Sequence, residues 1–170
     1  MNQCFKPVFT PLITEPEPMT IAVDLILTHK YHPHPQEPVQ ADLKLPLTAA
    51  ERQKSRQRLE LETGQAVHFN LPRGSHIHPN DYFQTADDQT LVQVTAKPEA
   101  VITVTAPTSL LLLKAAYHLG NRHVPLEVQQ TYLRFSPDHV LEGMLSQLGL
   151  QLQGEIVPFF PEEGAYGHHH

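Results

Sequence analysis

Hydrophobic and polar positions alternate in short runs over residues 20–96, and turn-forming residues separate these runs. The stretch "TIAVDLILT" at 20–28 is rich in β-branched residues, which is typical of a strand. "RLELE" and "AVHFNL" lie on either side of a Thr-Gly turn and predict a hairpin. A further strand follows a turn at Asp87 and Asp88. Short strands at this spacing predict an all-β unit.

One short helical turn is expected inside this unit. Thr48 and Glu51 have the spacing of a capping box, in which each side chain bonds the other residue's backbone N–H. The residues that follow are basic at every second position. This pattern predicts a solvated strand face, with a docking surface for an acidic partner as the alternative. The basic residues are Arg52, Lys54, Arg56 and Arg58.

In the second half of the chain the pattern changes to longer elements. "PTSLLLLKAAYHLG" predicts a helix with Thr108 or Ser109 at its N-cap and Gly120 as its end. "PDHVLEGMLSQLG" predicts a second helix, with Pro137 at its start and Gly149 just past its end. Strand-like runs precede, separate and follow the two helices.

The resulting order is β-α-β-β-α-β, the ferredoxin-like arrangement, in which two helices cover one face of a four-stranded sheet. We therefore expect an α+β protein with an N-terminal all-β domain, a ferredoxin-like domain and a short His-containing tail. The expected bounds are 1–18 for a disordered extension, 19–96 for the β domain, 97–160 for the ferredoxin-like domain and 161–170 for a flexible tail.

Composition and charge narrow the partners. The formal charge of −6 argues against nucleic acid. No apolar run approaches the ~20 residues of a membrane helix, and no leader for secretion is recognisable. Cys4 is the only cysteine, so an internal disulfide is excluded, which fits a reducing cytoplasm. We expect a cytoplasmic protein with no nucleic-acid or membrane partner.

Histidine is unusually frequent, with 12 in 170 residues, and neutral imidazoles can coordinate metal. His118 and His123 are five residues apart at the end of the first helix. On a helix their side chains would be roughly 140° apart, so they could not share one ion. His118 shares a stripe with Leu111 and Ala115 and is either a half-buried core residue or a ligand. His123 lies past the helix end, on a turn where side chains face outward.

The remaining histidines offer further candidates. His139 and Glu142 are three residues apart on the second helix, and such a pair either ligates a metal or simply marks a helix start. His29, His32 and His34 lie among prolines in an expected solvated loop, with a metal site as the alternative. The final "HHH" is either a native tail or an expression remnant.

The common catalytic signatures are absent from the sequence: HExxH, CxxC, the P-loop, GxGxxG after a strand and GxSxG. Ser75 lies beside His76 and His78, but no third partner accompanies them in the sequence, so we interpret them as a loop coincidence. The chemistry that the sequence offers is binding.

Three motifs carry a resemblance to a known family. "YHLGNRHVPL" at 117–126, "DHVLEGML" at 138–145 and "PFFPEEGAYG" at 158–167 follow one another in this order. Together they resemble the UreE family of urease accessory nickel chaperones. "SRQRLELETGQAVHFNLPRG" resembles the N-terminal β domain of the same family. The match covers roughly residues 20–167 and leaves the N-terminal extension without a counterpart.

The resemblance implies a homodimer formed through the ferredoxin-like domains, with His123 of both copies binding one Ni(II) on the two-fold axis. Zn(II) and Cu(II) also suit imidazole ligands. Two dimers around one ion are the alternative to a single dimer. The tail histidines and His139 would assist, although Pro137 stands where many relatives have a further histidine. The tail histidines are His168, His169 and His170.

The implied function is that of a nickel metallochaperone, not an enzyme, that delivers nickel to a urease assembly GTPase and the urease apoprotein. The N-terminal domain of the family resembles a peptide-binding module, which suits docking onto these partners. Two alternatives stay open. One is a zinc-dependent metallohydrolase that uses His139, Glu142 and a loop histidine. The other is a metal-free scaffold whose histidines are incidental.

Overall fold

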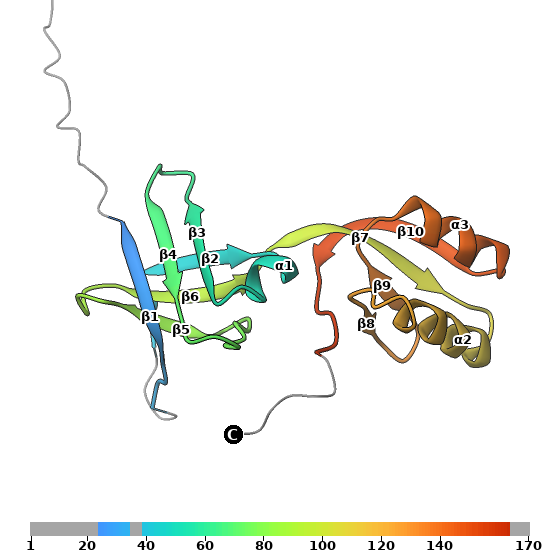
Figure 1. The fold of residues 1–170 in the computed structure, drawn as a ribbon, viewed down its shortest axis with the longest axis horizontal. Helices are drawn as coiled ribbons and strands as arrows, with labels where there is room; N and C mark the ends of the chain where they lie inside the picture. Colours follow the sequence, from blue (N-terminus) through green and yellow to red (C-terminus); the bar gives the residue numbers. More distant parts are fainter. Residues whose placement is uncertain (1–23, 35–38, 164–170) are drawn as a thin grey trace, which may run out of the picture.

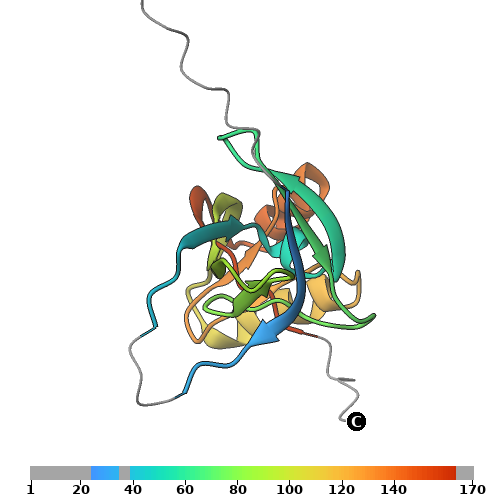
Figure 2. The same ribbon diagram turned by 90° about the vertical axis from the view of Figure 1, so that its left-hand side faces the viewer.

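The computed structural model describes residues 24–34 and 39–163, which form two domains lying end to end (Figure 1). The N-terminal domain is built on a six-stranded sheet, and the C-terminal domain on a four-stranded sheet with two helices. In Figure 2 the N-terminal domain stands in front of the C-terminal domain along the long axis. The expected α+β fold class is confirmed. The expected extension at 1–18 and the end of the tail at 164–170 lie outside the described residues.

The N-terminal sheet is mixed, with strand order β2-β6-β5-β1-β4-β3. The pairs β1–β4 and β2–β6 are parallel and join segments that are far apart in the sequence, whereas the other neighbours are antiparallel. The elements are β1 Leu25–Tyr31, β2 Leu43–Leu47, α1 Ala49–Arg52, β3 Arg56–Glu60, β4 Ala66–Asn70, β5 Tyr82–Thr85 and β6 Leu91–Ala96.

Local signals in this domain are largely confirmed. The predicted hairpin is β3–β4. Thr48 Oγ1 accepts the N–H of Glu51 at 3.3 Å, and Glu51 Oε2 accepts the N–H of Thr48 at 2.8 Å, so the capping box forms. The strand predicted at 20–28 is found from Leu25 onward, and residues 20–23 lie outside the described residues. The strand extends to Tyr31 and so contains His29, which we expected in a loop, because its pairing with β5 continues to Tyr31.

The prediction for Arg52 was wrong. This side chain, expected on a solvated face, is only 9% exposed, while Arg56 and Arg58 are exposed as predicted. Arg52 is the last residue of α1, which lies against the C-terminal domain. Its guanidinium donates a hydrogen bond to the carbonyl of Phe159 and lies 5.5 Å from the ring centre of Phe160. A small apolar cluster at this domain junction contains Ala49, Val101 and Phe159.

The C-terminal sheet has the strand order β10-β7-β9-β8 with every neighbouring pair antiparallel, which is the ferredoxin-like topology. Side chains from the sheet and from both helices form one core, with Val104, Ala115, Phe135 and Leu145 fully buried. The elements are β7 Pro98–Thr105, α2 Ser109–Gly120, β8 Glu127–Val128, β9 Leu133–Phe135, α3 His139–Gln147 and β10 Gln151–Pro158.

The helix starts are partly as predicted. Thr108 is the N-cap of α2 and accepts the N–H of Leu111 at 3.3 Å. The N-cap of α3 is Asp138, so Pro137 precedes the cap instead of starting the helix. Asp138 takes the cap because its carboxylate accepts two N–H groups of the first turn.

The chain after β10 stays attached to the C-terminal domain as far as the structure describes it. The N–H of Phe160 donates to Glu127 Oε2 at 3.1 Å, and that of Glu162 donates to the carbonyl of Leu126 at 2.8 Å. The first residues of the expected flexible tail therefore run beside β8. This segment places Phe159 to Glu163 at the domain junction.

Candidate metal centre

The end of α2 determines where His123 lies. The N–H of His123 donates to the carbonyl of Gly120 at 2.9 Å, and that of Val124 donates to the carbonyl of Leu119 at 3.4 Å. This pair of bonds is the Schellman motif, in which the residue past the helix takes a left-handed conformation. Here that residue is His123, with φ +55°. The helix ends at Gly120 as predicted, and His123 takes the left-handed position of the turn that follows it.

A left-handed histidine is unusual, because glycine takes this position without steric cost whereas other L-residues lose about 1–2 kcal/mol. The hydrogen bonds hold the turn on one side, and Val124 packs with Leu119 in the core on the other. The side chain of His123 itself is exposed. An exposed polar residue in this conformation is a candidate functional residue.

His118 is separate from this position. It is half-buried on α2, and its ring meets the ring of Tyr117 edge-on with centroids 5.7 Å apart. Its carbonyl accepts a hydrogen bond from Arg122 Nη1 at 2.8 Å, which ties the turn residues back to the helix. The half-buried environment matches the stripe predicted through Leu111 and Ala115.

The outer face of α2 is apolar and uncovered. Leu110, Leu113 and Tyr117 are 64%, 66% and 67% exposed. Their spacing puts them on one stripe of the helix, and the stripe leads towards the turn that carries His123. A row of large apolar side chains on a small domain is typical of an interaction surface.

The candidate pair His139 and Glu142 on α3 has one member that is already engaged in a hydrogen bond. His139 is exposed at the first position of α3. Glu142 Oε1 accepts the N–H of Asp138 at 3.1 Å, so this carboxylate is bonded to the helix start. The pair His139 and Glu142 therefore fits the interpretation as a helix-start pair, the alternative to metal ligation that we left open.

Within residues 24–34 and 39–163, His, Cys, Asp and Glu side chains nowhere gather in threes in a way that could hold a metal ion. A hydrolytic zinc site needs three protein ligands in one place. The described part of one chain does not supply them. The tail histidines at 168–170 are outside that part.

The sequence did not reveal one arrangement of histidines. His76 and His78, which we interpreted as a coincidence beside Ser75, line a cavity at the domain junction together with Glu163. The available signal was the His-x-His spacing, because alternate residues of an extended segment point the same way. The approach of Glu163, which is 85 residues further along the chain than His78, has no local signal.

Fold and surface thus define a two-domain α+β protein whose described histidines lie outside any preformed three-ligand centre. Residues 24–97 match the family model described as UreE urease accessory protein, N-terminal domain, and residues 99–170 match that of the C-terminal domain. The chain belongs to the UreE urease accessory protein family, and the resemblance seen in the sequence is confirmed.

Individual relatives agree. The chain is 53% identical over 146 residues to a protein of a Nostoc species named urease accessory protein UreE, covering 86% of this chain and 98% of the relative. Proteins of the same name from Nostoc punctiforme and Acinetobacter baumannii are 56% and 48% identical, covering 74% and 78% of this chain and 85% and 82% of theirs. In the described ranges, every helix is too short or too polar to span a lipid bilayer.

Proposed function

We propose that this protein is a nickel metallochaperone for urease maturation and that it acts without enzymatic activity. The observation that carries the proposal is His123, an exposed imidazole held in a left-handed conformation at the end of α2. Glycine would end this helix at lower cost. A histidine in its place is best explained by a need for the imidazole.

A second copy of the chain supplies the rest of the site. One imidazole alone binds a divalent ion weakly, but a two-fold axis beside His123 would bring two together. The apolar stripe of Leu110, Leu113 and Tyr117 supports such a dimer, because these side chains are exposed and lie on the helix that leads to the His123 turn. Two dimers around one ion would double the number of imidazoles.

A site of this kind suits transfer. Imidazole nitrogen is a good ligand for Ni(II), and also for Zn(II) and Cu(II). Two ligands leave coordination positions open, so that an acceptor protein can add its own ligands before the chaperone releases the ion. A closed four-ligand site would retain the ion instead.

Other histidines have supporting roles in this proposal. His168, His169 and His170 form the end of the tail and would add ligands to the central ion. His139 is a secondary candidate at the start of α3. His118 is the weakest ligand candidate, because it is half-buried. Its contacts with Tyr117 and Arg122 would support the turn that carries His123.

The acceptors are the urease assembly GTPase and the urease apoprotein, reached in the cytoplasm. The family membership supports this assignment. The N-terminal domain would serve as the docking module, since its six-stranded sheet is separate from the His123 turn and presents exposed basic residues on the edge strand β3. An extended segment of a partner can add to such an edge.

The test is a difference in bound nickel. The parent is the full chain with all three tail histidines replaced by alanine, so that they cannot bind the ion. Equilibrium dialysis should show that His123→Ala lowers the bound Ni(II) by one ion per two chains. His32→Ala, an exposed histidine of the N-terminal domain with no role in this site, should leave the amount unchanged. Equal nickel binding by the parent and His123→Ala would contradict the proposal.

A further inference from the structure

A second group of histidines lies on the loop between β4 and β5, in the N-terminal domain, whereas His123 lies in the C-terminal domain. Ile77 is 2% exposed, and its N–H donates to the carbonyl of Arg52 at 3.1 Å. Because alternate side chains of an extended segment point the same way, the buried Ile77 turns both His76 and His78 outward. Their rings lie side by side, with centroids 6.5 Å apart and an interplanar angle of 30°.

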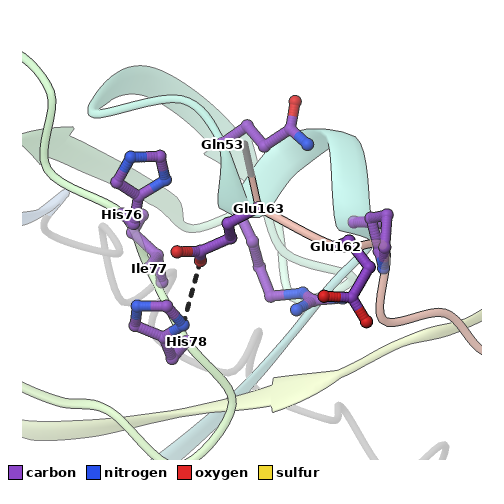
Figure 3. A pocket seen from close by; sticks show the side chains of 9 residues that line it. Gln53, His76, Ile77, His78, Glu162 and Glu163 are labelled. Carbon is purple, nitrogen blue, oxygen red and sulfur yellow. Dashed lines mark ion pairs between the residues drawn. The ribbon is translucent and has the colours of Figure 1, made fainter. Parts of the chain in front are cut away.

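A carboxylate from the other domain meets these rings. Glu163, in the segment after β10, has its Oε1 3.5 Å from Nδ1 of His78 (Figure 3). Two ligand atoms that share a tetrahedral ion at ~2.1 Å are about 3.4 Å apart, by the metal–ligand distances usual for zinc. His78 and Glu163 therefore already have the spacing of two metal ligands. His76 is exposed and can rotate to bring its ring closer.

The surroundings favour a cation. These side chains line a cavity of about 370 Å³, to which Glu162 and Arg52 also contribute. One guanidinium faces two carboxylates, so the cavity is negative when both imidazoles are neutral. The positive charge is partly engaged elsewhere, because Arg52 bonds the carbonyl of Phe159.

We propose that His76, His78 and Glu163 form a second site for a divalent transition metal with nitrogen and oxygen ligands, at the junction of the two domains. In the described residues no three such side chains are placed to hold an ion as they stand, so binding here would require the exposed His76 ring to move toward His78 and Glu163. The ion replaces the contact between His78 and Glu163 by bonds to both. This inference goes beyond the proposed function and does not depend on His123.

Closure of this site would join the N-terminal domain to the segment that leads into the tail. A bound ion would thus hold Glu163 at the domain junction. Because an ion that binds only the folded arrangement stabilises it, the metal should also raise the melting temperature.

The test uses the full chain with His123 and the three tail histidines replaced by alanine, and Ni(II) alone as the probe. Isothermal titration should show one ion per chain. The change His76→Ala with His78→Ala should abolish this binding and the rise in melting temperature. Glu163→Gln should weaken the affinity at least about tenfold, the loss that follows even when only a partner of a ligand is removed.

A matched control is present in the same domain. His32 and His34 have the same His-x-His spacing and are exposed. Replacing both by alanine should leave the titration unchanged. Nickel binding that survives in the His76 and His78 variant, or that disappears with His32 and His34, would overturn the proposal. Absence of any binding in the His123→Ala parent would overturn it as well, while leaving the His123 site to its own test.

Discussion

His123 and Gly149 occupy the same position in two copies of the same helix-ending motif. The N–H of His123 bonds the carbonyl of Gly120 at 2.9 Å, and the N–H of Gly149 bonds that of Ser146 at 3.0 Å. Both residues are left-handed, with φ values of +55° and +82°. Glycine, which suits this conformation, therefore follows α3, whereas an exposed imidazole follows α2.

This relationship predicts how substitutions at the turn affect stability. His123→Gly should unfold at a higher urea concentration than His123→Ala, by about 1 kcal/mol in the free energy of unfolding, because alanine keeps the left-handed strain that glycine removes. Both variants lack the imidazole and should lose the same nickel. Urea unfolding followed by circular dichroism measures the difference. An alanine variant at least as stable as the glycine variant would show that the turn is not strained.

The apolar stripe on α2 predicts the oligomeric state. Light scattering should give two chains per particle for the unmodified protein and one chain for Leu113→Glu, because a carboxylate in the middle of an apolar interface would be buried without a partner. Val140→Glu is the control, since Val140 is 65% exposed but lies on α3. It should remain dimeric. If Val140→Glu were monomeric and Leu113→Glu remained dimeric, the dimer interface would lie on α3 and not on α2.

Arg52 predicts a contribution of the domain junction to stability. Burial lowers the pKa of Arg52, and the carboxylate of Glu99 opposes this effect. Arg52→Met should cost about 1–3 kcal/mol, since the carbonyl of Phe159 loses its buried donor. Hydrogen exchange should also become faster at residues 159–163. Arg52→Lys is the control and should recover part of the loss. Unchanged exchange in the methionine variant would mean that Arg52 does not hold the two domains together.

The contact between Asp24 and His68 predicts a dependence on pH. The hydrogen bond from His68 holds the pKa of Asp24 below its ordinary value of 3.8. A lowered pKa in the folded state stabilises the protein above the ordinary value, and this contribution is lost as the pH falls through the lowered value. The stability difference between the unmodified protein and Asp24→Asn should therefore be present at pH 5 and shrink as the pH falls below 3.8. A difference that stays the same when the pH falls from 5 to 2 would contradict the assignment.

Local signals predicted much of the fold. The capping box of Thr48 and the left-handed Gly149 each depend on residues a few positions apart, and both are found. The parallel pairing of β1 with β4 and of β2 with β6 was not predicted, because it joins distant segments and the alternation of side chains does not select a neighbour. Arg52 was misjudged for the same reason, since the surface that covers it belongs to residues more than a hundred positions away.

The candidate site divides in the same way. His123 stood out in the sequence by its turn and by the resemblance of its motif, but its left-handed conformation was not expected, because glycine is the usual residue in that position. The cavity of His76, His78 and Glu163 depends on how the two domains meet. No pattern within either segment reports that contact.

The central claim is that two copies of His123 share one ion. Native mass spectrometry with Ni(II) tests it most directly, on the full chain in which His76, His78, His139 and the three tail histidines are alanine. We predict a dimer that carries one nickel, and a dimer without nickel when His123→Ala is added. A nickel on the monomer, or two on each dimer, would place the ion within a single chain and contradict the shared site.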